Sequence, residues 1–300
     1  LMHDGGIKVE RIANLVGELN ARVFSRLWSL LAPPELVANS CLIAMGSEGR
    51  GEQILKTDQD NALLLRDGFE CDELASIAAE FNAALAELGY PPCPGNIMLT
   101  NPLWRQSLTG FKDTLRDWVY GAERDGPMHL AIFIDSHAVA GDASLLTEAR
   151  DYLDRILVGS DSFLARFAAA IDLFDDSPSW WQRLTNKRDD KPIDLKKLGT
   201  FPIVHGVRAL ALQNHLRVNG TAERLRALID KHQIEPELVR DVLDALHHLM
   251  ALKLTHQLRQ LQAGQQPSNL VQPSDLGLPE RDPLHDALGI VRRFRSVLAQ

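Results

Sequence analysis

The sequence has 300 residues, of which 45% are hydrophobic and 24% are charged, the composition of an ordinary folded protein rather than a disordered or fibrous chain. Its formal net charge of −8, with both signs mixed along the chain, disfavours a broad nucleic-acid-binding surface. No apolar run approaches the roughly 18 residues of a membrane span, and no signal-peptide pattern is seen, so we expect a cytoplasmic protein without a membrane partner. Three cysteines without CxxC spacing fit the same reducing compartment.

The first predicted element is an amphipathic helix over residues 7–31, where apolar side chains recur every three or four positions until Pro33 and Pro34 stop the pattern. Two short apolar runs follow, CLIAM at 41–45 and NALLL at 61–65. Both are bounded by turn residues and polar clusters, which predicts two buried strands.

The next part of the chain alternates between helical and apolar patterns. A helix is predicted over 71–88, and a further strand or a docking loop over 96–99. Mostly helical spacing over 101–119 predicts one or two short helices. The run HLAIFID at 129–135 is short, apolar and rich in branched and aromatic residues, so we expect a third strand that ends in Asp135.

Beyond residue 143 the strand signals nearly vanish and helical patterns take over. Proline and glycine in the stretch 264–283 predict a surface loop before the last helix. The helices are expected over 144–157, 162–174, 195–218, 222–231, 236–261 and 282–298.

This change of pattern predicts an α+β protein with a small mixed sheet followed by an all-helical region. The expected ranges are 1–35 for the N-terminal helical segment, 36–142 for the sheet domain and 143–300 for the helical domain.

Two aspartates in the motif TDQD suggest a metal site. Asp58 and Asp60 lie at positions i and i+2, and in an extended segment this spacing points both carboxylates to one side. Neighbouring carboxylates repel unless a cation lies between them, and hard oxygen ligands suit Mg²⁺ or Mn²⁺. Asp135 is the expected third carboxylate, and Asp142 is its competitor.

A Gly-Ser turn follows the first predicted strand. Gly46 has no side chain to block a phosphate, and the turn offers backbone N–H groups and the Ser47 hydroxyl. Phosphate donors beside metal-binding carboxylates suggest a nucleoside triphosphate with two bound ions, one at the attacking hydroxyl and one at the leaving pyrophosphate.

Gly46-Ser47, a gap of ten residues, Asp58-x-Asp60 and the later Asp135 together resemble the DNA polymerase beta-like nucleotidyltransferase superfamily. Within it, GSEGRGEQ and TDQDNAL resemble the group related to PII-protein uridylyltransferases, and most of all the bacterial nucleotidyltransferases commonly fused behind cyclic-nucleotide-binding and CBS-pair domains. The resemblance implies that such N-terminal regulatory domains are missing from this chain.

The resemblance continues through NPLWRQSL and IFIDSHAVAGD to IDLKKLGTFPIVHGVRALAL, so it covers nearly the whole chain. It implies a helical substrate-binding domain at the C-terminus and transfer of a nucleotide to a protein or small-molecule acceptor. One departure is His137, where relatives have arginine, which weakens any phosphate role at that position.

Several other residues have alternative interpretations. Arg50 is expected either to contact the triphosphate or to pair locally with Glu48 and Glu52. Lys196 is a candidate for the nucleotide or an acidic substrate, although Asp194 before it would serve equally as a helix cap.

Five further candidates carry less weight. Gln53 and Lys56 are expected either to contact the triphosphate from the loop, as Arg50 would, or to be exposed side chains. Asn61 is expected either to orient the metal site or to end the turn. Trp104 is expected in the core rather than in a binding wall, and Arg208 is a cleft candidate.

The sequence therefore predicts a metal-dependent nucleotidyltransferase whose nucleotide and acceptor it does not identify. The alternative is a regulatory module that binds the nucleotide and senses it without transferring it.

Overall fold

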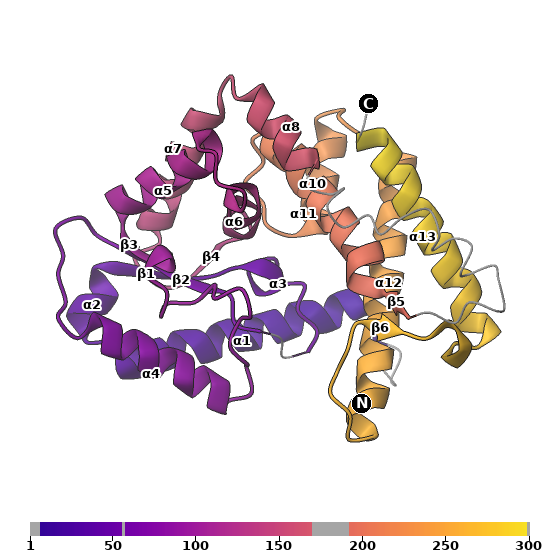
Figure 1. Ribbon diagram of the computed structural model, residues 1–300, viewed down its shortest axis with the longest axis horizontal. Helices are drawn as coiled ribbons and strands as arrows, with labels where there is room; N and C mark the ends of the chain where they lie inside the picture. The colour runs from indigo at the N-terminus through magenta and orange to yellow at the C-terminus, as the bar shows by residue number, and fades with distance from the viewer. Residues whose placement is uncertain (1–6, 56–57, 170–191, 299–300) are drawn as a thin grey trace. The chain divides into compact units, whose positions relative to one another are not determined.

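The computed structural model describes residues 7–55, 58–169 and 192–298. The chain forms two compact units, one from Arg11 to Phe163 and the other from Leu164 to Gln300 together with Leu1–Glu10 (Figure 1). We call them the sheet unit and the helical unit.

The sheet unit is built around a mixed four-stranded sheet in the order β3-β2-β1-β4. β1 pairs antiparallel with both β2 and β4, and β3 joins the far side of β2 in parallel. Every residue of β1 and β2 is buried, which explains why both strands read as unbroken apolar runs. The strands span Ser40–Ala44 (β1), Asn61–Leu65 (β2), Arg105–Ser107 (β3) and His137–Gly141 (β4).

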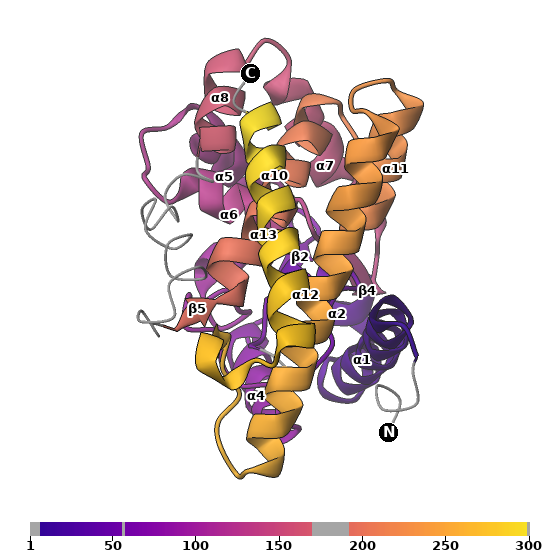
Figure 2. The ribbon, with the colours of Figure 1, turned by 90° about the vertical axis from the view of Figure 1, so that its right-hand side faces the viewer.

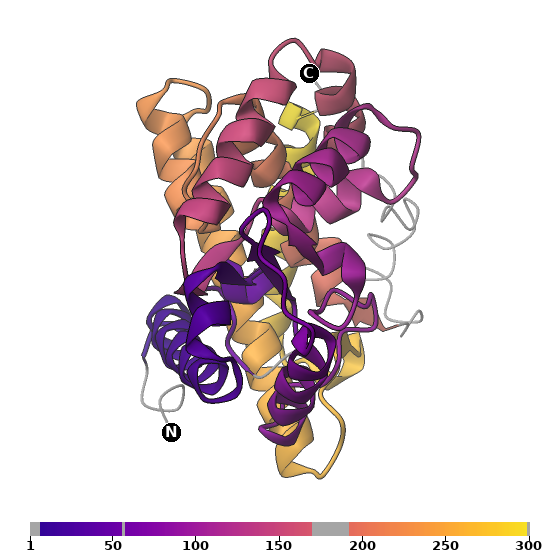
Figure 3. The same ribbon diagram turned by 90° about the vertical axis from the view of Figure 1, so that its left-hand side faces the viewer.

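One face of this sheet is covered by the N-terminal helix and by α4, which lie on the same side of the strands in Figures 1 and 3. Phe24 and Trp28 reach the core from the N-terminal helix and meet Phe81 of α4, the Trp28 and Phe81 rings packing edge to face at 5.5 Å. These aromatic side chains bury large apolar areas and so fix the helices to the sheet. The elements are α1 (Val9–Leu31), α2 (Pro34–Ala38) and α4 (Leu74–Glu87).

The opposite face is covered by α5 and α7, which pack on each other and on the central strands (Figure 1). α6 packs against α5 through aromatic side chains, with Phe111 and Phe133 at a ring distance of 4.9 Å. The elements are η1 (Pro102–Trp104), α5 (Leu108–Tyr120), α6 (Gly126–Phe133) and α7 (Ser144–Leu157).

The helical unit is dominated by the long antiparallel pair α12 and α13, against which α10 and α11 pack (Figure 2). Gly206 of α10 makes this packing close, because an added Cβ would lie 2.3 Å from Leu298 of α13. α8 (Asp161–Ala169) spans the sequence boundary between the two units at Phe163. The other elements of the helical unit are β5 (Ile193–Asp194), η3 (Lys196–Thr200), α10 (Phe201–Gln213), α11 (Thr221–Asp230), α12 (Pro236–Gln262), β6 (Leu270–Val271), η4 (Pro273–Asp275) and α13 (Leu278–Leu298).

Most predicted elements are confirmed, including the α+β class, both early strands and the later helices, while residues 170–174 of one predicted helix lie outside the described residues. The predicted strand at 129–135 is wrong. Residues 126–133 form α6, whose first turn contains Pro127, and Asp135 follows this helix two residues before β4. The stretch 96–99 is a loop, and the third and fourth strands are Arg105–Ser107 and His137–Gly141.

The predicted loop over 264–283 is interrupted by structure that the sequence did not suggest. It contains the short strand β6, which pairs with β5, and the first turn of α13 begins at Leu278. None of the helices in the described ranges combines the length and apolar character that a membrane crossing requires.

The domain ranges expected from the sequence remain predictions. By its contacts α7 packs on α5 and the sheet, and the sheet unit extends to Phe163.

Candidate active site

The register of the sheet gathers the candidate residues at one edge. Ala44, the last residue of β1, is paired with Asn61 on one side and with His137 on the other. The residues just before β2 and β4 therefore flank the turn that leaves β1. Asp60 precedes β2 directly, and Asp135 lies two residues before β4.

The turn after β1 is a single helical turn, α3 (Gly46–Gly49), and two of its glycines are required by close approach. Gly46 has φ +60°, and a Cβ there would lie 2.4 Å from Oδ2 of Asp60. A Cβ on Gly49 would lie 2.0 Å from the carbonyl oxygen of Asp135. The turn thus sits directly between the two aspartates, and only glycine allows this approach.

Asp58 and Asp60 lie in the segment that enters β2 rather than within the strand. Exposure alternates along it: Asp58 is exposed and Asp60 half-buried, whereas Gln59 and Asn61 are 2% and 1% exposed. This alternation is that of an extended chain, in which the two carboxylates share the accessible side. The predicted common orientation of the pair is consistent with this pattern.

Buried amide side chains hold this segment in place. Gln59 donates from Nε2 to the carbonyl oxygens of Asn82 (3.0 Å) and Tyr90 (2.8 Å), and Asn82 donates to Oε1 of Gln59 at 2.6 Å. Asn61 accepts hydrogen bonds at Oδ1 from the Asn82 amide and from the Leu99 N–H. Asn61 therefore fastens β2 to α4 and the following loop.

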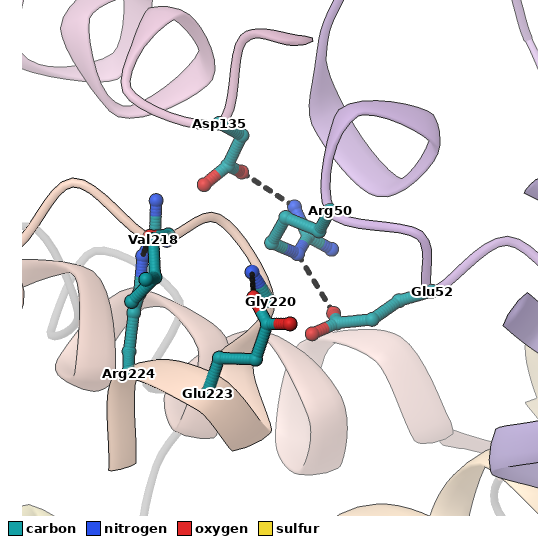
Figure 4. A network of polar contacts seen from close by, with 7 residues as sticks. All are labelled: Arg50, Glu52, Asp135, Val218, Gly220, Glu223 and Arg224. Atoms are coloured by element: carbon teal, nitrogen blue, oxygen red, sulfur yellow. Dashed lines mark hydrogen bonds and ion pairs between the residues drawn. The ribbon is translucent and has the colours of Figure 1, made fainter. Parts of the chain in front are cut away.

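Asp135 is fully buried and forms an ion pair with Arg50, 2.6 Å from carboxylate oxygen to Nη1 (Figure 4). The Nε of Arg50 also pairs with Glu52 at 2.7 Å. Burial by itself would lower the pKa of the Arg50 guanidinium, but the two carboxylates raise that pKa above its usual value. The local pairing predicted with Glu52 is confirmed, whereas Glu48 binds elsewhere.

Glu48 accepts a hydrogen bond at Oε2 from the side-chain amide of Asn20 on α1, at 2.9 Å. The Tyr90 hydroxyl in turn donates to Oδ1 of Asn20 at 2.5 Å. Burial raises the pKa of Glu48 to about 7, although the Asn20 hydrogen bond acts in the opposite direction.

Cys93 adds a thiol to the surroundings of Asp60. Burial and the neighbouring Asp60 carboxylate raise the pKa of Cys93 to about 11, so the thiol is protonated at neutral pH. The sequence did not mark Cys93 as part of this site.

Not all of the predicted site residues meet. Within the described ranges, no three His, Cys, Asp or Glu side chains form a cluster that could hold a metal ion, so the three-carboxylate arrangement stays a prediction. Asp142 is at the other end of the sheet, where its N–H donates to Ser40 at the start of β1 and its carboxylate pairs with Arg66. It does not compete with Asp135 for this site.

The remaining candidates have other positions. Lys196 lies in the helical unit, where its N–H and that of Lys197 donate to Oδ1 of Asp194, which confirms the capping role of that aspartate. Trp104 is a core residue, 1% exposed, as expected. Lys56 lies outside the described residues.

Gln53 and Arg208 are buried, 4% and 6% exposed. The Gln53 side chain is therefore not exposed, which excludes one of the two alternatives predicted for it. The predicted place of Arg208 in a binding cleft remains a prediction.

Two family models match the chain. One, described as "Putative nucleotidyltransferase DUF294", matches residues 1–125, and the other, described as "Putative nucleotidyltransferase substrate binding domain", matches residues 161–300. The chain belongs to this nucleotidyltransferase family. The match confirms the resemblance to nucleotidyltransferases seen in the sequence, and the second model describes the family's C-terminal part as substrate-binding. A search of curated proteins gave no match.

Sequence reasoning missed the residues that support the site. Asn20, Asn82 and Tyr90 hold the turn and the aspartate segment, yet they lie far from both in sequence. The available signal was weak: a polar Asn20 amid the buried positions of an amphipathic helix, and Asn82 in an otherwise apolar stretch of α4.

Proposed function

We propose that this protein is a metal-dependent nucleotidyltransferase. It would move a nucleoside monophosphate from a nucleoside triphosphate to a hydroxyl group on a protein or small molecule and release pyrophosphate. The observation that carries the proposal is the edge of the sheet where the Gly46 turn lies against the carboxylate of Asp60, in a chain that belongs to a nucleotidyltransferase family.

The donor set at this edge fits Mg²⁺ or Mn²⁺. Asp58 and Asp60 offer hard oxygen atoms on the accessible side of the segment. Mg²⁺ commonly takes only one or two carboxylates and completes its shell with water and substrate phosphates, so a closed cage of protein ligands is not required. Two such ions would neutralise the charge of the triphosphate and of the leaving pyrophosphate.

The residues of the turn would bind the triphosphate. The first N–H groups of a helical turn have no acceptor within the helix and point outward, and the Ser47 hydroxyl adds another donor. Gly46 lets the turn approach the Asp60 carboxylate closely, so that donors of the turn and that carboxylate could act on the same metal-bound triphosphate.

Arg50 and Asp135 would have successive roles in the reaction. The buried guanidinium neutralises Asp135 in the free protein. We propose that Arg50 moves to the triphosphate oxygens, where bidentate contacts are favourable, and that the released Asp135 carboxylate accepts the proton of the attacking hydroxyl and completes the metal site. Lys196 of the helical unit would add a positive charge for the triphosphate or the acceptor.

A binding and turnover experiment tests the proposal. Each of the four ribonucleoside triphosphates is titrated calorimetrically into the protein with and without Mg²⁺, and pyrophosphate release is then measured with cell extract as a source of acceptor. We expect Mg²⁺-dependent binding of at least one triphosphate and pyrophosphate release that depends on the extract. Absence of binding for all four would contradict the proposal.

The second candidate is a nucleotide-sensing module, and the Arg50–Asp135 ion pair favours it, because that pair neutralises the proposed third carboxylate. The two candidates differ in turnover. Tight Mg²⁺-dependent binding with no pyrophosphate release or labelled product across a broad set of acceptors would favour the sensor.

A further inference from the structure

Two parts of the proposed site, the Gly46–Gly49 turn and the Asp58–Asp60 segment, are held by the same residue, Tyr90, which follows α4. Its backbone carbonyl accepts from Gln59, between the two aspartates, at 2.8 Å. Its hydroxyl donates to Asn20, which in turn donates to Glu48 of the turn. Tyr90 therefore holds the aspartate segment through its backbone carbonyl and the turn through its hydroxyl.

In the hydrogen-bonded series Tyr90–Asn20–Glu48, Tyr90 and Asn20 are buried and Glu48 is half-buried. Tyr90 is 4% exposed and Asn20 is 7% exposed, and the Tyr90 ring packs edge to face on Phe24 of α1 at 5.2 Å. A buried polar group that loses its partner is costly, so this chain has one favourable arrangement. Glu48 belongs to the turn itself, so the position of its carboxylate sets the position of the turn.

We propose that Tyr90 and Asn20 are positioning residues that hold the Gly46–Gly49 turn, through Glu48, in the geometry that binds the triphosphate. The inference rests on the proposed function for its effect on nucleotide binding. Neither Tyr90 nor Asn20 touches the nucleotide in this account; both act through Glu48.

The test uses the 300-residue chain, five single variants and one double variant, Asn20→Leu/Tyr90→Phe. Asn20→Leu keeps the branched shape of the side chain and removes both of its hydrogen bonds, and Tyr90→Phe removes only the hydroxyl that donates to Asn20. Trp28→Phe is the matched control, because it weakens the packing of the same helix against Phe81 and leaves the polar chain intact. Glu48→Ala removes the acceptor, and Glu48→Gln retains an oxygen that can accept from Asn20.

The first measurement is amide hydrogen exchange of residues 46–52 without nucleotide. Loss of one buried hydrogen bond is expected to speed exchange there by about tenfold in Asn20→Leu and Tyr90→Phe. Trp28→Phe should leave the exchange of the turn unchanged relative to the rest of the sheet unit. Unchanged exchange in Asn20→Leu, or an equal increase in Trp28→Phe, would overturn the proposal.

The second measurement is the Kd of the tightest-binding ribonucleoside triphosphate with Mg²⁺, on folded protein. We expect a Kd about tenfold weaker in Asn20→Leu, Tyr90→Phe and Glu48→Ala, and a Kd close to wild type in Glu48→Gln and Trp28→Phe. Because Tyr90 acts through Asn20, the double variant Asn20→Leu/Tyr90→Phe should bind the triphosphate no more weakly than Asn20→Leu alone. Faster exchange with an unchanged Kd, or additive losses in the double variant, would overturn the proposal.

A wild-type protein that binds none of the four triphosphates would reject the proposed function. The hydrogen-exchange measurement would then decide by itself whether the hydrogen bonds from Tyr90 through Asn20 to Glu48 hold the turn. The two failures are therefore distinguishable.

Discussion

Asp135 depends on the guanidinium of Arg50 for its charge compensation inside the sheet unit. Its side chain is fully buried, whereas Arg50 is 9% exposed and also pairs with Glu52. Removing the cation from a buried ion pair costs far more than removing an exposed ion pair, because the buried carboxylate loses an attraction that offsets its desolvation.

Arg50→Met should therefore lower the free energy of unfolding by about 3 kcal/mol. Asp135→Asn should cost less, because Arg50 retains Glu52. The double variant Arg50→Met/Asp135→Asn should be more stable than Arg50→Met alone, because the fully buried Asp135 charge is removed together with its cation. Urea unfolding of the three proteins measures these differences, and a double variant less stable than Arg50→Met would contradict this reading of the pair.

Glu48 gives the protein a specific dependence on pH. Its pKa is raised by burial to about 7 from the ordinary 4.5, so between these two pH values the folded state binds more protons than the unfolded state. The contribution of Glu48 to stability is complete below pH 4.5 and is lost as the pH rises through 7.

Glu48→Gln should remove this dependence. The free energy of unfolding of the variant minus that of the wild type should rise by about 1 to 3 kcal/mol between pH 4.5 and pH 7 and then level off. Denaturant unfolding at several pH values measures it. Subtraction cancels other titrating groups, and a difference that stays flat over this range would show that Glu48 has an ordinary pKa.

At the scale of elements, the turn between β1 and β2 offers a matched pair of glycines. Gly46 and Gly51 both have positive φ, +60° and +66°, but a Cβ on Gly46 meets the Asp60 carboxylate, whereas nothing lies within 4 Å of a Cβ on Gly51. Alanine at either position should be destabilising by about 1 kcal/mol for the backbone conformation alone.

Only Gly46→Ala is expected to displace Asp60. Its Kd for Mg²⁺-nucleoside triphosphate should weaken by at least about tenfold, while Gly51→Ala should bind like the wild type. Calorimetric titration of both variants compares them. Equal losses of binding would mean that backbone strain, rather than contact with Asp60, governs the turn.

The elements also show where sequence patterns succeed and fail. Buried runs such as NALLL are short, bounded by turns and confirmed as strands. HLAIFID has a similar composition but forms α6, since a short apolar run suits either state and tertiary contacts decide. Here Phe133 packs on Phe111, and His129 lies edge to face with Trp104. Pro127 in the first helical turn was the local signal for a helix.

For the candidate site, the sequence predicted the turn and the aspartate pair because both are local motifs. It could not predict the state of Asp135, because the ion pair with Arg50 joins residues 85 positions apart. The Tyr90–Asn20–Glu48 chain was missed for the same reason: the positions it links are 70 and 28 residues apart.

At the scale of the whole molecule, the candidate catalytic residues and the family's substrate-binding part lie in different compact units. The sheet unit contains the turn and the aspartates, and the family's substrate-binding part matches residues 161–300. Lys196 is the proposed contribution of the helical unit to nucleotide or acceptor binding.

Lys196 has a matched control beside it. Lys197 is exposed as well, and the N–H groups of both residues donate to Oδ1 of Asp194. Lys196→Ala should raise the KM of transfer for the triphosphate or the acceptor severalfold, whereas Lys197→Ala should leave both unchanged. Steady-state kinetics of the two variants tests this difference. Identical kinetic constants for Lys196→Ala and Lys197→Ala would show that Lys196 has no specific role in binding.

Nucleotidyl transfer by this protein is proposed to depend on Asp58 and Asp60. The most direct measurement follows the label of an α-³²P nucleoside triphosphate into acid-stable acceptors in cell extract with Mg²⁺, for the wild type and for Asp58→Asn/Asp60→Asn. Circular dichroism and thermal unfolding first establish that the double variant is folded. We expect labelled product with the wild type and none above background with the double variant; undiminished transfer by the folded double variant would show that the two aspartates are not needed for transfer.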